Sequence, residues 1–97
     1  MIKSFKNQAT EDIFNGTRSK KSLKLLPNEL HEQAAFKLDL INITGNLNDL
    51  RVPPSNRLEK LTGNRKGFHS LRINDQWRII FRWSADGAED VEILDYH

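Results

Sequence analysis

Apolar and polar side chains alternate with a period of two in the second half of the chain, and this pattern predicts β-strands. The alternating runs lie at residues 58–61, 68–73, 77–83 and 91–94. Short polar segments separate the last three runs, and those at residues 74–76 and at Asp86-Gly87 are typical hairpin links. We therefore expect three or four consecutive antiparallel strands.

The first half of the chain shows helical spacing instead. Apolar residues recur every three or four positions between Pro27 and Gly45, which predicts one long helix. A shorter helix over residues 11–14 is expected after a cap at Asn7 or Thr10, and Gly16 closes it. The apolar stripe of the long helix consists of Leu30, Ala34, Leu38 and Ile41.

The remaining segments of this half are expected to be simple. Residues 17–22 are polar and basic, and an ordinary solvated loop is the interpretation that we favour over a phosphate-binding one. His31 lies one position past Leu30 with no evident partner, so we expect a surface histidine. Residues 1–5 are short and mixed, which suits an edge strand.

Helices followed by strands indicate an α+β domain. We expect a single domain over residues 1–97, with two N-terminal helices packed on one face of a small, twisted antiparallel sheet. The opposite face then carries Arg78 and Arg82, because both alternate with the side chains of Trp77 and Trp83 on the core side of their strand.

Charge is distributed in blocks that the formal net charge of +2 conceals. Residues 51–82 carry eight Lys and Arg against two acids, whereas residues 83–97 carry five acids and no Lys or Arg. A basic block of this kind is typical of nucleic-acid-binding surfaces, although a solvated sheet face has the same composition.

Other classes of protein are disfavoured by composition. The chain has no cysteine and no apolar run long enough to cross a bilayer. We expect a cytoplasmic protein that has no disulfide framework, no membrane contact, no metal site and no cofactor.

The last predicted strand continues into Asp95-Tyr96-His97, an acid, a phenol and an imidazole. Imidazole is the side chain best suited to acid or base chemistry near neutral pH. The carboxylates of Asp95 and of the chain end favour its protonated form. These residues either fray or present chemistry, and we expect the second.

Four segments, in this order, resemble the HigB killer proteins, including the GraT toxins, of the RelE/ParE superfamily of bacterial type II toxin–antitoxin systems. They are Met1-Ile2-Lys3-Ser4-Phe5, Gly63-Asn64-Arg65-Lys66-Gly67, Asn74-Asp75-Gln76-Trp77-Arg78-Ile79 and Asp95-Tyr96-His97. The resemblance implies a RelE-like, microbial-RNase-like fold and an endoribonuclease that cuts mRNA in the ribosomal A site. It also implies a helix-turn-helix antitoxin of the HigA kind, encoded nearby, which neutralises the toxin and binds operator DNA.

RNA cleavage by a 2′-hydroxyl needs a base, a cation beside the phosphate and an acid for the leaving oxygen. We assign His97 as the acid, as the resemblance also implies, and Arg78 as the cation. Glu59 is the candidate base. It and Thr62 stand where better-studied family members have His and Lys, so the base and one phosphate contact depart from the family pattern.

Supporting roles are expected for the neighbours of these residues. Tyr96 is a candidate to orient the phosphate or to stack on a base, with core packing as the alternative. Asp95 is a candidate to orient His97 or an arginine, and His69 is expected to be packed or at an edge. The candidate RNA-binding residues are Arg57, Arg65, Lys66, Arg72 and Arg82.

Two other functions remain open at this point. The same scaffold serves ParE-type relatives that inhibit gyrase by binding, without catalysis. A basic RNA-binding module that does not cleave is the third interpretation. The Asp95-Tyr96-His97 ending favours the ribonuclease, because a protein that only binds needs no imidazole there.

Overall fold

A computed structural model describes residues 1–96, in which three α-helices precede a four-stranded sheet. The helices are α1 (Gln8–Asn15), α2 (Lys20–Leu25) and α3 (His31–Ile43). The strands are β1 (Glu59–Lys60), β2 (Phe68–Arg72), β3 (Trp77–Ser84) and β4 (Gly87–Asp95). Short 3-10 turns connect these elements at η1 (Asn28–Leu30), η2 (Leu47–Arg51), η3 (Pro54–Asn56) and η4 (Gly63–Arg65).

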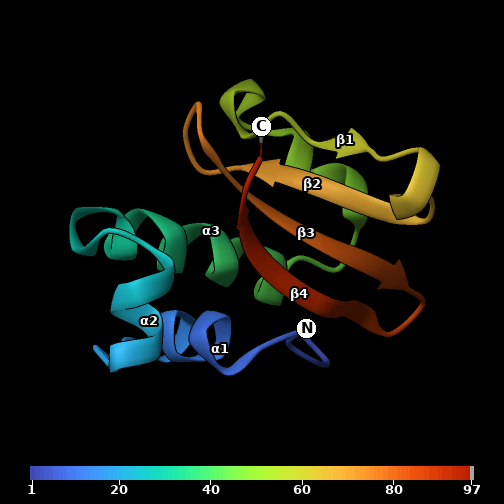
Figure 1. Cartoon of the computed structure of the whole chain (residues 1–97). Coiled ribbons are helices and arrows are strands. Elements are labelled where there is room, and N and C mark those ends of the chain that lie inside the picture. Colours follow the sequence, from blue (N-terminus) through green and yellow to red (C-terminus); the bar gives the residue numbers. More distant parts are fainter. Residues whose placement is uncertain (97) are drawn as a thin grey trace.

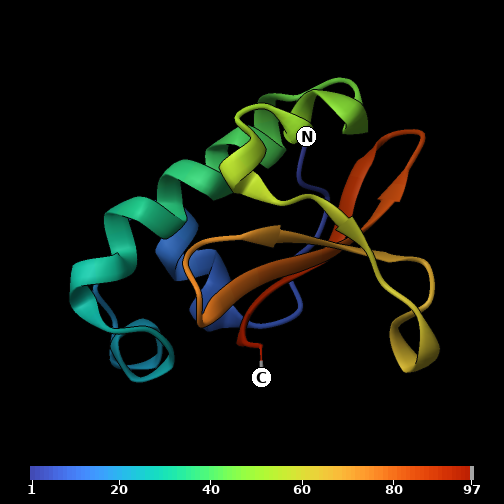
Figure 2. The same cartoon turned by 90° about the horizontal axis from the view of Figure 1, so that it is seen from above.

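The sheet has the order β1-β2-β3-β4, and each strand is antiparallel to its neighbour. Figures 1 and 2 show the helices on one side of the twisted sheet, while the other side is open. The architecture is therefore α+β with helices on one face, as the order of the sequence patterns predicts. The open face is the one on which Arg78 and Arg82 lie.

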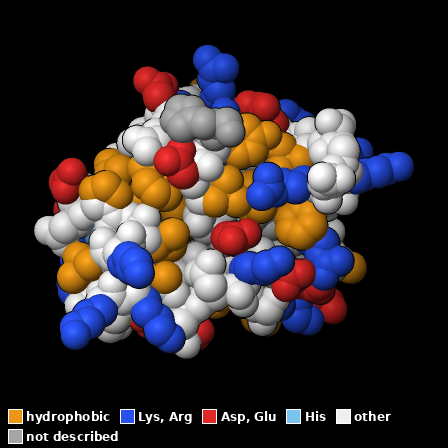
Figure 3. Space-filling model, viewed as in Figure 1, with side chains coloured by type: hydrophobic (Ala, Val, Ile, Leu, Met, Phe, Trp, Pro, Cys, Tyr) orange, Lys and Arg blue, Asp and Glu red, His pale blue; other side chains and the backbone are white. Residues whose placement is uncertain are grey.

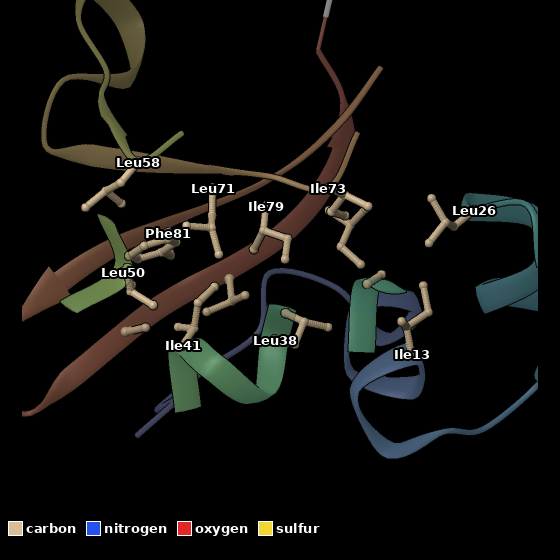
Figure 4. Packing of buried hydrophobic residues seen from close by; sticks show 14 residues of the cluster. Ile13, Leu26, Leu38, Ile41, Leu50, Leu58, Leu71, Ile73, Ile79 and Phe81 are labelled. Carbon is tan, nitrogen blue, oxygen red and sulfur yellow. The ribbon is translucent and has the colours of Figure 1, made fainter. Parts of the chain in front are cut away.

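The core fills the space between α3 and the covered face of the sheet (Figure 4). Leu38 and Ile41 of α3 lie against Leu71, Ile79 and Phe81 of the two central strands, and all five side chains are fully buried. Burial of side chains of this size contributes about 1.5–3 kcal/mol each. This packing fixes the orientation of the sheet and thereby the direction in which the alternate residues point.

The prediction of two helices was wrong by one, because α2 lies in a segment that we assigned in part to a loop. Its first turn is capped by Ser19, whose Oγ accepts a hydrogen bond from the Ser22 N–H at 3.0 Å. The Ser19 hydroxyl also donates to Asp12 Oδ2 at 2.6 Å, and this bond lowers the pKa of Asp12. A cap and a contact with α1 thus make a helix of a stretch whose composition suggests solvent.

The prediction that His31 is a surface residue was also wrong. Its side chain is fully buried, and Nε2 lies 2.8 Å from the carbonyl oxygen of Leu26. A carbonyl only accepts, so Nε2 carries the proton, and Nδ1 has no partner among the described residues. His31 begins α3 and lies on the same side of the helix as the buried Ala34 and Leu38, beside Leu30, which packs against the core but stays partly exposed.

The N-terminal segment runs beside β4 but forms isolated bridges there and not the edge strand that we expected. Ile2 pairs with Ala88 and Phe5 pairs with Val91 as isolated parallel bridges. The Lys3 N–H donates to the Ala88 carbonyl at 2.7 Å. None of the helices within residues 1–96 has the length and apolar composition to cross a membrane.

Candidate functional site

Three strands bring polar side chains together on the open face of the sheet. The register pairs Glu59 of β1 with Ser70 of β2, and Arg72 of β2 with Arg78 of β3. Directly paired residues point to the same face of a sheet, so these positions share the open side. Figure 3 shows the molecule from this side, where Lys and Arg side chains lie interspersed with apolar and acidic ones.

The guanidinium of Arg78 lies at the centre of a cluster that we call the Arg78 cluster: Glu59, Ser70, Arg78 and Tyr96. Arg78 Nη2 donates to Glu59 Oε1 at 3.1 Å, and Nη1 donates to Ser70 Oγ at 3.1 Å and to the Arg57 carbonyl at 3.3 Å. The Tyr96 ring centroid lies 5.6 Å from the Arg78 Cζ, within the range of a cation–π contact. The cation is therefore fixed by contacts from several segments of the chain.

The two charged members of the Arg78 cluster differ in exposure. The Arg78 side chain is 15% exposed and that of Glu59 is 51% exposed. Only Oε1 of the Glu59 carboxylate is engaged, and Oε2 has no hydrogen bond within the described residues. The cluster thus combines a largely buried cation that has several partners with a half-exposed carboxylate that it contacts through one oxygen.

A hollow beside the cluster gathers further positive charge. Arg57, Arg72 and Arg78 line it together with Ser55 and Asp75, and its volume is about 410 Å³. Arg72 Nη2 pairs with Asp75 Oδ1 at 2.5 Å, and this hydrogen bond, followed by the charge of Arg72, lowers the pKa of Asp75. Three guanidiniums against one carboxylate make the hollow attractive to an anion such as a phosphate.

Arg65 reaches the open face from the opposite direction, through the turn η4. Its side chain lines two hollows, and the first of them is shared with Leu94, Asp95 and Tyr96. The second hollow is lined by Lys6, Asn64, Arg65, Phe68, Ile80 and Glu92. Lys66, the next residue, is exposed and lines neither of them.

Arg82 repeats the surroundings of Arg78 four residues further along β3. Arg82 Nη2 pairs with Asp90 Oδ2 at 2.7 Å, and its Cζ lies 5.7 Å from the Phe68 ring centroid. Its side chain is 52% exposed, so that solvent competes for its charge far more than for that of Arg78.

Of the last predicted site residues, Asp95 ends β4 and Tyr96 follows it. Asp95 is paired with Trp77 in the register, and its Oδ2 accepts a hydrogen bond from Gln76 Nε2 at 2.9 Å. Within the strand Asp95 therefore alternates with Leu94, which is paired with Arg78, but at the end of the strand it still lines the hollow with Arg65 and Tyr96. His97 lies outside the residues that the structure describes, and its role as general acid stays a prediction.

His69 points to the covered side of the sheet, away from the Arg78 cluster. Its ring centroid lies 5.9 Å from that of Phe81. Burial lowers the pKa of His69, and the charges of Lys60 and Arg51 lower it further. The ring is therefore neutral near pH 7 and packed, in line with the expectation from sequence.

Sequence reasoning missed Ser70, which is buried and hydrogen-bonded to Arg78. The sequence contained a signal for it, because Ser70 lies two residues from both Phe68 and Arg72 and therefore shares a face of the strand with Arg72. It also missed Lys6, which only the pairing of the N-terminal segment with β4 brings to this face.

Comparison with known proteins gives one family and two relatives. Residues 3–97 match the family described as RelE-like toxin of type II toxin-antitoxin system HigB. The chain is similar to Toxin HigB-1 of Vibrio cholerae serotype O1, with 36% identity over 97 residues that cover 100% of this chain and 98% of that protein. It is also similar to an uncharacterized protein of Haemophilus influenzae, with 38% identity over 72 residues that cover 74% of this chain and 70% of that protein.

Proposed function

Because the chain belongs to the HigB-like toxins of type II toxin–antitoxin systems, we propose that it arrests growth as a ribosome-dependent endoribonuclease that cuts mRNA. The observation that supports this activity most is the Arg78 cluster, in which a fixed guanidinium lies beside a carboxylate on an open, basic sheet face. The site of action is then the cytoplasm, where the ribosome supplies the substrate.

The proposed reaction is attack by a ribose 2′-hydroxyl on the adjacent phosphorus. Glu59 takes the 2′-hydroxyl proton through its unengaged oxygen, and the bond between phosphorus and the 5′-oxygen breaks. His97 gives a proton to that leaving oxygen, which leaves a 2′,3′-cyclic phosphate on one fragment and a 5′-hydroxyl on the other. Arg78 stabilises the negative charge that develops on the phosphoryl oxygens.

The remaining residues of the open face are proposed to position the RNA. Tyr96 lies next to the guanidinium and is placed to contact the phosphate or to stack on a base. Arg57 and Arg72 extend the positive charge on one side of the Arg78 cluster, and Arg65 extends it on the other. Thr62 has no charge, so it is not able to make the phosphate contact expected from the Lys of other family members. Arg57 and Arg65 are the candidates to make that contact instead.

As a type II toxin, the protein has an antitoxin as its partner. We propose that this antitoxin carries a helix-turn-helix domain and represses the shared operon by binding operator DNA. Membership of the family supports this proposal. For the toxin itself, the basic sheet face together with the Arg78 cluster supports RNA rather than DNA as the substrate.

Replacing Glu59 by Gln tests the reaction. Induction of the native toxin in a bacterial host is expected to stop growth and to leave cut ends within translated mRNAs, mapped by primer extension. Glu59→Gln removes the base and is expected to lower the cleavage rate by about 10²–10⁴-fold. Asp86→Asn, which changes an exposed acid at the β3–β4 turn, serves as the control and should cleave normally.

A second readout separates catalysis from binding. Growth arrest by the native toxin while translated mRNAs stay intact would exclude the ribonuclease and favour an inhibitor that acts by binding. His97→Ala adds an independent check, since loss of the proposed acid should abolish cleavage in the same way.

A further inference from the structure

Helix α3 carries apolar side chains on both of its sides. Ala34, Leu38 and Ile41 lie in the core, whereas Phe36 is 60% exposed and Ile43 is 75% exposed. A helix that packs only on its own sheet normally has a polar outer side. The composition of α3 therefore indicates that its outer side is also buried at some stage, against another molecule.

Together with the half-buried Leu40, the two exposed side chains form one stripe rather than scattered positions. Phe36, Leu40 and Ile43 follow at spacings of four and three, which places them along one side of the helix. The stripe continues into a hollow of about 270 Å³ that Leu40, Ile43, Leu50 and Val52 line together with Thr44, Gly45 and Asp49. We call Phe36, Leu40, Ile43 and Val52 the α3 face.

The location of the α3 face separates it from the Arg78 cluster. In Figures 1 and 2, α3 covers one side of the sheet, and its outer side is turned away from the strands. Val52, which is 74% exposed, extends the face beyond the C-terminal end of the helix. A ridge of apolar side chains beside a hollow is the shape that receives the anchor residues of an amphipathic helix.

Acidic side chains border the α3 face. Residues 28–51 contain four acids, one lysine and Arg51, which lies beside Val52 and donates through Nε to Asn48 Oδ1 at 3.4 Å. Lys37, that lysine, directs its ammonium to Asn56 Oδ1 and not to the acids. All four acids are exposed, and within residues 1–96 none of them forms an ion pair: Glu29, Glu32, Asp39 and Asp49.

The charge of the border selects the kind of occupant. Unpaired carboxylates repel the phosphates of RNA and attract lysine and arginine side chains. A second copy of this chain has the same acidic border, so a symmetric contact through the α3 face would bring like charges together. The surface therefore fits a protein segment with apolar anchors flanked by basic residues.

We propose that the α3 face is a docking surface for the antitoxin, which binds it with an amphipathic segment of apolar and basic side chains. This inference rests on the toxin–antitoxin part of the proposed function, because that system supplies the partner. It is independent of whether the toxin acts by cutting RNA.

The double variant Phe36→Ser/Ile43→Ser tests the docking surface. Tagged toxin is expressed alone and together with the antitoxin encoded beside it, and growth and antitoxin recovery on the tag are measured. Alone, the variant is expected to arrest growth as the native toxin does. With the antitoxin, its arrest should persist, and antitoxin recovery should fall at least about tenfold, because buried aromatic and aliphatic anchors dominate such contacts.

Two further variants make the result specific. Leu23→Ser removes an apolar side chain that is 44% exposed on α2, outside the α3 face, and should be neutralised like the native toxin. Glu32→Lys/Asp39→Lys leaves the apolar stripe intact and should weaken antitoxin binding, most strongly at low salt. This charge variant also keeps the test decisive if the serine variant folds poorly.

Three results would overturn the proposal. The first is full neutralisation and full antitoxin recovery with both the serine and the charge variant. The second is a native toxin that light scattering shows to be a dimer, which the serine variant converts to a monomer while the antitoxin stays bound. The third is equal loss of binding with Leu23→Ser. Intact mRNA during arrest would refute the ribonuclease and leave the docking result unaffected.

Discussion

Replacing Arg78 by Met removes the guanidinium and keeps an unbranched side chain in its place. The substitution deletes the donors to Glu59, to Ser70 and to the Arg57 carbonyl together with the contact to Tyr96. If Arg78 stabilises the developing charge on the phosphate, loss of one such preorganised donor lowers the cleavage rate by about 10²–10³-fold.

The same substitution has a limited cost in stability. Ser70 is buried, and a buried hydroxyl that loses its partner costs about 1–3 kcal/mol. The ion pair with Glu59 adds about 0.2–1 kcal/mol at most, because the Glu59 side chain is half exposed. A domain of this size has a free energy of unfolding of about 5–15 kcal/mol, so Arg78→Met is expected to remain folded.

The assay is the rate at which programmed ribosomes lose full-length mRNA, with urea denaturation of each variant alongside. Arg82→Met is the matched comparison, since Arg82 also has an acid and an aromatic ring as neighbours. Arg82 is more exposed than Arg78, so its contact with RNA is worth only as much as one solvated ion pair. Arg82→Met should therefore lower the cleavage rate by about tenfold or less. Equal rates for Arg78→Met and the native protein, with both folded, would refute the assignment of Arg78.

Two other properties of the molecule give clear expectations. A Cβ at Gly87, where φ is +136°, would lie 2.0 Å from the Met1 carbonyl oxygen. Gly87→Ala should therefore lower the free energy of unfolding by roughly 2 kcal/mol or more, whereas Gly45→Ala, with no atom within 4 Å, should leave the thermal midpoint unchanged. Burial holds the pKa of His69 below its ordinary value of 6.5, so the unfolded chain binds the proton more readily and stability is lost as pH falls below 6.5. His69→Gln should lose less stability than the native protein between about pH 7.5 and about pH 5.5, as measured by urea denaturation. Parallel losses in the two proteins would contradict the role given to His69.

The sequence predicted the parts of the fold that depend on one long, regular pattern. The apolar residues Leu71, Ile79 and Phe81 recur at every second position of β2 and β3 and pack against α3, so a shift of one residue would expose that core side, although Ile80 interrupts the polar side of β3. The open face and the position of Arg78 on it followed from this alternation. The partners of Arg78 did not, because the pairing of β1 with β2 depends on the length of the segment between them and not on a local pattern.

The errors lie where a local signal competes with tertiary contacts. α2 has six residues, too few for helical propensity to decide, and Ser19 with α1 stabilises it. His31 was placed at the surface because the sequence showed no partner for its ring. Its burial depends on the turn at Pro27 and on the Leu26 carbonyl, which a sequence pattern does not show.

The start of β4 differs from simple alternation for a physical reason. Counting back by twos from Val91 would place Glu89 in the core, where an ionised carboxylate without a partner is costly. The register shifts between Ile80 and Arg82, and Asp90, with φ of 53°, takes the extra position of a bulge. Ala88 is buried instead, and Glu89 is paired with Arg82 in the register.

This bulge also sets the two arginines of β3 apart. Ser4 Oγ accepts a hydrogen bond from the Asp90 N–H at 2.8 Å, which holds the bulge, and the Asp90 carboxylate pairs with Arg82. The acid of Arg82 thus comes from a neighbouring strand that the N-terminal segment fastens. The acid of Arg78 comes from the two-residue edge strand β1 and is half exposed. If Arg78 acts on the phosphate as proposed, the carboxylate that an incoming phosphate has to displace is therefore the half-exposed Glu59 of an edge strand, and not an acid held by the bulge.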